Sequence, residues 1–193
     1  MRRHYAALLR RAASLPSLPL VASLHADALR RGAVLVPSLI HAYSACGDPA
    51  SARNVFDGLP VQEQTLSART ALASAISTHG RCREVLGLFI GREGEMDDKA
   101  VTVVLAACAR AGMVAEGREV FARVRRPALQ HYTCMVEMLG RTGEVEEAER
   151  LVAQMKARPD RVIFTVLLAA CRVHGRVDVA ERVASLMRNY GIA

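Results

Sequence analysis

The sequence contains no tryptophan and only four tyrosines and four phenylalanines among its 193 residues. Alanine and aliphatic residues make up most of the hydrophobic half of the chain. Such a composition suits close-packed helices better than a β-sandwich, whose strands are enriched in aromatic and β-branched residues. We therefore expect an all-α protein, and the chain is long enough to bury a core.

Long apolar runs and acidic residues are also scarce. No run of eighteen apolar residues occurs, so we expect neither a membrane-spanning helix nor a membrane partner. The 19 Asp and Glu are outnumbered by 26 Lys and Arg, mostly Arg, which gives a formal net charge of +7. A basic balance of this size fits a polyanionic partner, although an organellar destination would produce the same bias.

Motifs for metal binding and catalysis are missing. The five cysteines include no Cys-x-x-Cys pair, and the six histidines include no His-x-Glu sequence. No Walker loop, Gly-x-Ser-x-Gly or His-Glu-x-x-His occurs. We therefore expect a non-enzyme without cofactor or metal, in which reduced cysteines serve as small apolar residues.

Residues 1–32 are basic, with Asp27 as their only acid and arginines at positions 2, 3, 10, 11, 30 and 31. An Arg-rich, acid-poor start is typical of a mitochondrial or chloroplast transit peptide. The alternative is a further pair of helices with a basic face. The two interpretations do not exclude each other.

The chain repeats itself. Residues 166–183 and 103–120 share eight of eighteen positions. Five glycines recur at spacings of 33, 32, 31 and 32 residues, namely Gly47, Gly80, Gly112, Gly143 and Gly175. Apolar residues stand eight and four positions before each glycine, and mostly small residues stand five positions after it. A fixed period of this length indicates a repeat architecture.

Each period has the pattern of two short helices. The apolar spacings place one stripe on each helix, and a glycine between the helices can end the first of them. Pro60, Pro127 and Pro159 fall between periods, where they interrupt helix propagation. Helices of about a dozen residues are not stable alone. We therefore predict an α-solenoid of stacked helix-turn-helix repeats that forms a right-handed superhelix.

The wording of the repeats resembles one family. Residues 39–47 (LIHAYSACG), 52–60 (ARNVFDGLP) and 131–141 (HYTCMVEMLGR) are similar to repeats of plant pentatricopeptide proteins of the PLS class, which mix repeat lengths. Residues 167–175 (LLAACRVHG) resemble the start of that class's E-type C-terminal extension, here truncated. The resemblance implies a basic segment or degenerate repeat at 1–32, repeats at 33–63, 64–98, 99–128 and 129–160, and a terminal E-type repeat at 161–193.

The resemblance also implies a function. Such proteins bind single-stranded RNA in mitochondria or chloroplasts, reading one base per repeat. Members with E-type ends usually select sites for cytidine-to-uridine editing. We therefore expect a monomeric, non-catalytic specificity factor in the mitochondrion, or alternatively the chloroplast. Residues 161–187 would recruit a deaminase-bearing protein or other editing factor in trans.

The family reads bases with a residue ten positions before the glycine, and here four of five such positions hold threonine. They are Pro37, Thr70, Thr102, Thr133 and Thr165. The residues alone leave two interpretations of these threonines, a helix N-cap or a hydroxyl that bonds a base edge. The resemblance favours base contact for Thr70, Thr102 and Thr133; Thr165 lies in the E-type segment, which is not expected to read bases.

The family's second reading residue is the last of each repeat. It would pair Thr70 with Asp98 and Thr133 with Asp160, which in the family suggests guanine, although the join leaves Asp97 as an alternative to Asp98. A position three residues before the threonine normally holds an apolar wedge between bases. Val34 and Val162 fit this position, whereas Ser67, Lys99 and Gln130 do not.

Six arginines in the second half of the chain have two possible interpretations: they contact phosphates, or they lie on a solvated helix face. Their positions are 118, 123, 125, 126, 141 and 150. Three or four reading repeats at about 1–2 kcal/mol each supply roughly 4–8 kcal/mol, so the chain needs a partner to select one site.

Two rival functions remain, a helical-repeat adaptor that binds protein and a truncated, non-functional relative.

Overall fold

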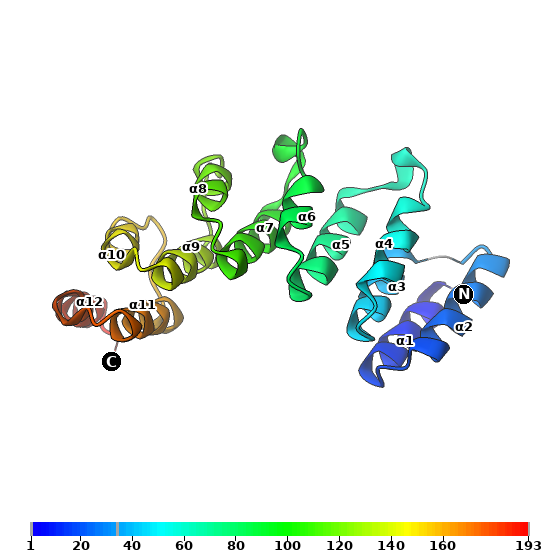
Figure 1. The fold of residues 1–193 in the computed structure, drawn as a ribbon, viewed down its shortest axis with the longest axis horizontal. Helices are drawn as coiled ribbons and strands as arrows, with labels where there is room; N and C mark the ends of the chain where they lie inside the picture. The colour runs from blue at the N-terminus through cyan, green and yellow to red at the C-terminus, as the bar shows by residue number, and fades with distance from the viewer. Residues whose placement is uncertain (1, 34, 193) are drawn as a thin grey trace. The chain divides into compact units, whose positions relative to one another are not determined.

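The computed structural model describes residues 2–33 and 35–192, and the described chain is built from helices. It divides into two units, Met1–Glu95 and Met96–Ala193 (Figure 1). In each unit, consecutive helices pair into hairpins and the hairpins stack on one another. The prediction of an all-α stack of two-helix repeats is therefore confirmed within each unit, whereas the handedness of a superhelix stays a prediction.

The first unit contains three hairpins. Their helices are α1 (Arg2–Ser14) with α2 (Leu18–Arg30), α3 (Val36–Ala45) with α4 (Pro49–Asp57), and α5 (Leu66–Thr78) with α6 (Cys82–Gly87). Two 3-10 turns, η1 (Val61–Glu63) and η2 (Glu93–Glu95), follow the second and third hairpins. The first helices α1, α3 and α5 pack side by side, and each contacts its own second helix.

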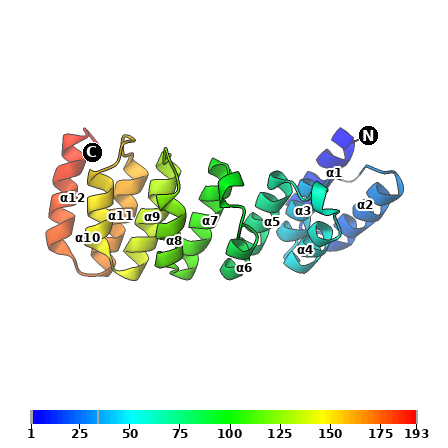
Figure 2. The same ribbon diagram turned by 90° about the horizontal axis from the view of Figure 1, so that it is seen from above.

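The second unit repeats this plan. Its hairpins are α7 (Asp98–Ala111) with α8 (Val114–Ala122), α9 (Leu129–Thr142) with α10 (Val145–Ala153), and α11 (Arg161–Val173) with α12 (Val177–Asn189). The first helices α7, α9 and α11 form one layer, and α8, α10 and α12 form the other (Figure 2). Each hairpin thus buries its apolar face against its neighbours, as short helices require.

The five periodic glycines mark the ends of the first helices, as predicted. All five have positive φ angles between 65° and 88°. At Gly112 and Gly143 the left-handed backbone lets the glycine N–H donate to the carbonyls of Cys108 and Leu139, which caps the helix. This turn allows the second helix to fold back on the first at a fixed point of every period.

The predicted apolar stripes form the core. The residues eight positions before the glycines are all 3% exposed or less, and they are Leu39, Leu72, Val104, Met135 and Leu167. The residues four positions before are 6% exposed or less, and they are Tyr43, Ile76, Cys108, Leu139 and Cys171. The cysteines carry free thiols. Burial raises the pKa of the Cys134 thiol to about 11, which keeps it protonated near neutral pH.

The described part of residues 1–32 forms the hairpin α1–α2. Leu9, Val21 and Ala28 are at most 1% exposed, and α1 packs on α3 as α3 packs on α5. The Tyr5 hydroxyl donates to the Asp27 carboxylate and joins the two helices. This segment has the structure of a repeat; its additional role as a transit peptide stays a prediction.

Arginine side chains connect the second helices of successive repeats. Arg118 of α8 reaches across to the first turn of α10, where its guanidinium pairs with Glu147 at 2.7 Å and also with Glu144. The interaction lowers the pKa of the Glu147 carboxyl. Acidic residues at the start of α10 therefore have arginine partners in the preceding repeat as well as a favourable position near the helix dipole.

The following repeat supplies further partners to α10. Arg176 pairs with Glu146 and, at 3.0 Å, with Asp178, while Arg182 pairs with Glu149 at 2.7 Å. Hydrogen bonds from Arg176 lower the pKa of Asp178 from 3.8 to about 2. The charged face of α10 is therefore an inter-repeat network, and exposed pairs of this kind gain stability mainly as a network.

We predict that this network makes unit stability sensitive to acid. Because the pKa of Asp178 is depressed in the folded state, its stabilising effect is present above pH 3.8 and is lost as pH falls toward about 2. Arg176→Gln should therefore weaken the loss of unfolding free energy over this window, measured by chemical denaturation at a series of pH values. Arg172→Gln removes an equal charge from an exposed arginine and should keep the wild-type profile. Identical profiles for both variants would contradict the prediction.

Small residues set how closely the helices approach. A Cβ on Gly140 would lie 2.7 Å from the Cβ of Ala170, so α9 and α11 meet almost backbone to backbone. A Cβ on Gly117 would overlap the end of the Met138 side chain. Gly117, one of the small residues five positions after a periodic glycine, therefore lies where a second helix approaches a first helix closely. Gly140 makes a similar close contact between two first helices.

We predict that Gly140→Ala destabilises the second unit despite the higher helix propensity of alanine. The gain of about 1 kcal/mol in propensity is outweighed by an overpacking cost of about 1–3 kcal/mol, because the methyl group of Ala170 cannot rotate away. Thermal unfolding should show a lower midpoint for Gly140→Ala and partial recovery in Gly140→Ala/Ala170→Gly. Gly87→Ala is the control, since a Cβ at this helical glycine meets no atom within 4 Å. Equal midpoints for Gly140→Ala and Gly87→Ala would refute this account.

Candidate nucleic-acid interface

Three threonines occupy the same place on the three first helices of the second unit. The hydroxyls of Thr102, Thr133 and Thr165 each donate to the carbonyl of the first residue of their own helix, at 2.7, 3.0 and 2.8 Å. Thr102 and Thr133 are partly exposed and Thr165 is exposed. Each hydroxyl proton is therefore used within the helix, while the oxygen lone pairs remain free to accept a hydrogen bond. We call these residues the threonine row.

The N-cap interpretation of these threonines is wrong. Each lies five residues after the N-cap, inside the first turns of its helix. The side chains that cap the helices belong to Thr65, Asp97 and Asp160, which accept from the backbone N–H three residues later. The capping residues therefore lie five positions before the threonines that the sequence offered as caps.

Thr70 differs from the threonine row. Its side chain is only 3% exposed, and its hydroxyl is the one buried side-chain polar atom without a hydrogen-bond partner among the described residues. The Thr70 hydroxyl is thus buried, unlike those of the threonine row, and base contact by Thr70 stays a prediction. Arg69 beside it is buried as well. Both residues are buried because α5 has only a weak amphipathic pattern and is covered on several faces.

The cap register also resolves the join at Asp97 and Asp98. Asp97 caps α7 just as Asp160 caps α11, each five residues before a threonine of the row. Asp98 is instead the first helical residue, and its carbonyl accepts from Thr102. Asp97, given above as the alternative to Asp98, is therefore the residue equivalent to Asp160, and its pairing with Thr70 stays a prediction. Pro37, at the equivalent of the threonine position, is exposed near the start of α3.

A buried histidine aligns the row. His131 is 0% exposed, its Nδ1 accepts from the Ala128 N–H at 3.1 Å, and its Nε2 donates to the Asp98 carbonyl at 3.0 Å. The same carbonyl accepts from Thr102. His131 thus satisfies the backbone N–H of the N-cap residue Ala128 and ties the start of α9 to the start of α7. His131 was not among the predicted site residues.

The wedge positions are only partly described. Val34 lies outside the described residues, whereas Val162 is 57% exposed on the first turn of α11. Ser67, Lys99 and Gln130 are exposed at the equivalent positions, as expected for polar residues. The second unit therefore presents one apolar side chain beside the threonine row, at its last helix.

The arginines that were candidates for phosphate contact fall into two classes. Arg118 is held by carboxylates of the next repeat, and Arg141 pairs with Glu137 at 2.9 Å on its own helix. Arg125 and Arg126 are exposed in the loop before α9. Arg118 and Arg141 therefore fit the interpretation of a solvated helix face whose charges are paired. Glu146 pairs with Arg176 and not with Arg150, four residues along its own helix.

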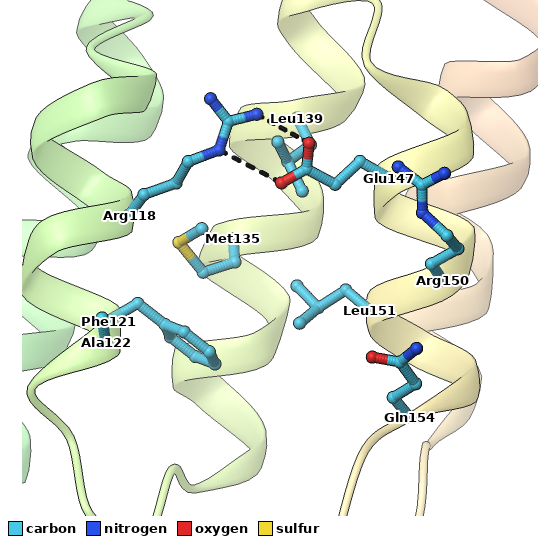
Figure 3. Close-up of a pocket in the computed structure, with 9 residues that line it drawn as sticks. All are labelled: Arg118, Phe121, Ala122, Met135, Leu139, Glu147, Arg150, Leu151 and Gln154. Carbon is cyan, nitrogen blue, oxygen red and sulfur yellow. Dashed lines mark hydrogen bonds and ion pairs between the residues drawn. The ribbon is translucent and has the colours of Figure 1, made fainter.

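A pocket of about 380 Å³ lies between α8, α9 and α10, on the side of the second helices. Figure 3 shows Met135 at its centre, Phe121 and Leu151 on either side, and the Arg118–Glu147 ion pair across one end. Arg150 and Gln154 complete the lining with polar side chains. None of the residues that line the pocket belongs to the threonine row.

No group of three or more His, Cys, Asp or Glu side chains in the described chain is arranged to hold a metal ion. None of the described helices combines the length and hydrophobicity needed to cross a membrane.

Comparison with known proteins identifies the repeat. The model of the PPR repeat matches residues 38–60, 100–126, 130–159 and 162–192, which is more than half of the chain. A mitochondrial pentatricopeptide repeat-containing protein of Arabidopsis thaliana is 39% identical over 152 residues, covering 76% of this chain and 24% of the relative. A second such Arabidopsis protein is 41% identical over 151 residues, covering 74% of this chain and 29% of the relative. The chain thus spans about a quarter of the length of these relatives.

Solved structures share the fold. The pentatricopeptide repeat protein PPR10, crystallised with an 18-nucleotide RNA, aligns with a TM-score of 0.63 at 24% identity, covering 98% of this chain and 29% of that protein. The nuclear protein-only RNase P 2 of Arabidopsis thaliana aligns with a TM-score of 0.61 at 17% identity, covering 80% and 38%. The first helices of the hairpins end at periodic glycines, and the repeat model matches four of these hairpins. This chain therefore belongs to the pentatricopeptide repeat family.

Proposed function

We propose that this protein binds single-stranded RNA with sequence selectivity and acts as a non-catalytic specificity factor in an organelle. The observation that carries the proposal is the threonine row, whose oxygens lie at one register on three packed helices. Membership of the family supports it, since the related protein PPR10 was crystallised with RNA. One base per repeat is the corresponding mode of recognition.

The pair of Thr133 and Asp160 offers the clearest base contact. The Thr133 oxygen retains lone pairs, and Asp160 uses Oδ1 to accept from the Ile163 N–H, which leaves its other oxygen available. Both groups act as acceptors toward a base. Guanine is the base whose Watson–Crick edge presents two adjacent N–H donors, so we propose guanine at this position.

The other positions contribute less. By the cap register, Thr102 pairs with Ala128, which has no polar side chain, and Asp97 pairs with the buried Thr70. Recognition in the described second unit therefore rests on one full pair and one single hydroxyl. At about 1–2 kcal/mol per base, this is too little to select one transcript, so a partner must add specificity.

We infer that residues 161–187, as an E-type extension of a PLS-class protein, recruit a deaminase-bearing protein or another editing factor in trans. They correspond to α11 and most of α12, where Val162, Val173 and Val177 are 57%, 74% and 68% exposed. Exposed apolar residues of this kind are suited to a protein contact. The mitochondrion is the proposed location, with the chloroplast as the alternative, because relatives carry mitochondrial names and the chain is basic.

We predict that the protein binds an RNA selected from a random single-stranded pool with a steep salt dependence, and that Asp160→Asn lowers its preference for guanine at one position about tenfold. Asparagine caps helices as well as aspartate, so α11 should remain folded. Fluorescence anisotropy with the selected RNA and its single-base variants measures both quantities.

Asp48→Asn is the matched control, because Asp48 caps the second helix α4 in the same way, accepting from the Ser51 N–H at 2.9 Å. It should leave base preference unchanged. A protein that binds no RNA at low salt would instead act as the helical-repeat adaptor. Equal guanine preference in wild type and Asp160→Asn would show that this pair does not read the base.

The editing role gives a separate prediction. Disruption of the gene should abolish cytidine-to-uridine conversion at one or a few sites in organellar transcripts, measured by sequencing. Complementation with Val173→Asp/Val177→Asp should fail to restore editing if these valines dock the partner, while RNA binding by the purified variant stays intact. Normal editing in the disrupted line would exclude the editing role and favour another step of RNA processing or a non-functional relative.

A further inference from the structure

The positive charges of the second unit fall into two structurally different groups. Arg118, Arg176 and Arg182 of the second helices are held in ion pairs by carboxylates of neighbouring repeats. A second group is exposed, and the structure shows no hydrogen bond or ion pair between its side chains and any described residue. Its members are Lys99, Arg125, Arg126, Arg150, Lys156, Arg161 and Arg172. Four of these, Arg125, Arg126, Lys156 and Arg161, lie in or next to the loops before α9 and α11, and we call these four the basic edge.

The members of the basic edge come from two equivalent loops. Arg125 and Arg126 lie between α8 and α9, and Lys156 lies between α10 and α11, with Arg161 as the first residue of α11. Figure 2 shows both loops at the same edge of the stack formed by α8 to α12. Arg158 of the second loop donates to the Tyr190 carbonyl at 2.9 Å, so its charge also lacks a carboxylate partner.

Carboxylates at this edge do not cancel the charge. Asp97 and Asp160 each use one oxygen to accept from a backbone N–H, and neither pairs with a cation of the basic edge among the described contacts. Ion-paired arginines must break existing bonds before they can bind a phosphate. The cations of the basic edge have no such competitor, and unlike the equally unpaired Arg150 and Arg172 they lie at the loops that precede α9 and α11.

The basic edge also lies next to the threonine row. Thr133 and Thr165 stand four residues after the first residues of α9 and α11, so one helical turn separates each hydroxyl from the loop that precedes its helix. A nucleotide whose base meets a threonine would therefore have its phosphate within reach of long side chains on that loop. The two loops belong to successive repeats, as consecutive nucleotides would require.

We propose that the basic edge binds the phosphates of the RNA strand whose bases meet the threonine row. The inference rests on the proposed function and adds the course of the strand: the backbone follows the loops between repeats and not the arginines of the second helices. Phosphate contacts supply affinity and salt dependence without sequence preference. They would supplement the small contribution expected from one full reading pair.

The test compares three charge-matched double variants in RNA binding at a series of salt concentrations. Arg125→Gln/Arg126→Gln should weaken binding by the same factor on every RNA sequence and flatten the log–log salt slope by roughly 1.4, for two single-strand phosphate contacts. Lys156→Gln/Arg161→Gln should do the same. Arg83→Gln/Arg172→Gln removes an equal charge from exposed arginines outside the basic edge and should keep the wild-type slope.

The outcomes separate the inference from the function on which it rests. If the wild type binds RNA but all three variants behave alike, the basic edge is refuted and the proposed function stands. If the wild type binds no RNA at low salt, both are refuted. A poly-glutamate chain that displaces RNA at equal charge concentration, with the same dependence on Arg125 and Arg126, would identify a docking surface for acidic protein and also overturn the inference.

Discussion

The close approach of successive first helices is the constraint on which the second unit depends. Gly140 and Ala170 allow α9 and α11 to meet at backbone distance, and His131 bonds the start of α9 to the Asp98 carbonyl at the start of α7. Together these contacts fix both the separation and the relative height of the helices. The short helices are not stable alone. A shift in register would break the hydrogen bond of the buried His131 and bring a side chain into the space that Gly140 leaves open, so the observed register is favoured.

That register determines which polar groups can act together. The threonine row is aligned only because each first helix starts at the same level, and Thr102 shares its acceptor carbonyl with His131. On the opposite layer, the same stacking brings Arg118 and Arg176 against the acidic start of α10. One stacking geometry therefore pairs Arg118, Arg176 and Arg182 with carboxylates of neighbouring repeats and leaves the side chains of the basic edge without a carboxylate partner.

The period of the chain could be predicted from its glycines, because a left-handed helix end has few alternatives to glycine and the apolar spacing around it is fixed by the helix. The N-caps and the burial of Thr70 could not. Threonine suits a cap, a base contact and a helix interior almost equally, so its role depends on tertiary burial. The position of Asp97 required the helix start, which shifts by a residue or two in any reading of sequence.

The third repeat differs from the repeats of the second unit in the length of its second helix and in the burial of its threonine. Its second helix, α6, has only six residues, the family model matches none of residues 61–99, and its threonine is buried. Its caps and glycine turn are nevertheless intact, with Thr65 bonded to the Ala68 N–H and Gly80 at a φ of 75°. Folding requires the turn, the cap and the apolar stripe, whereas base contact also requires an accessible hydroxyl. Selection on a repeat can therefore lose recognition first and retain the fold, because the residues that serve the two purposes are different.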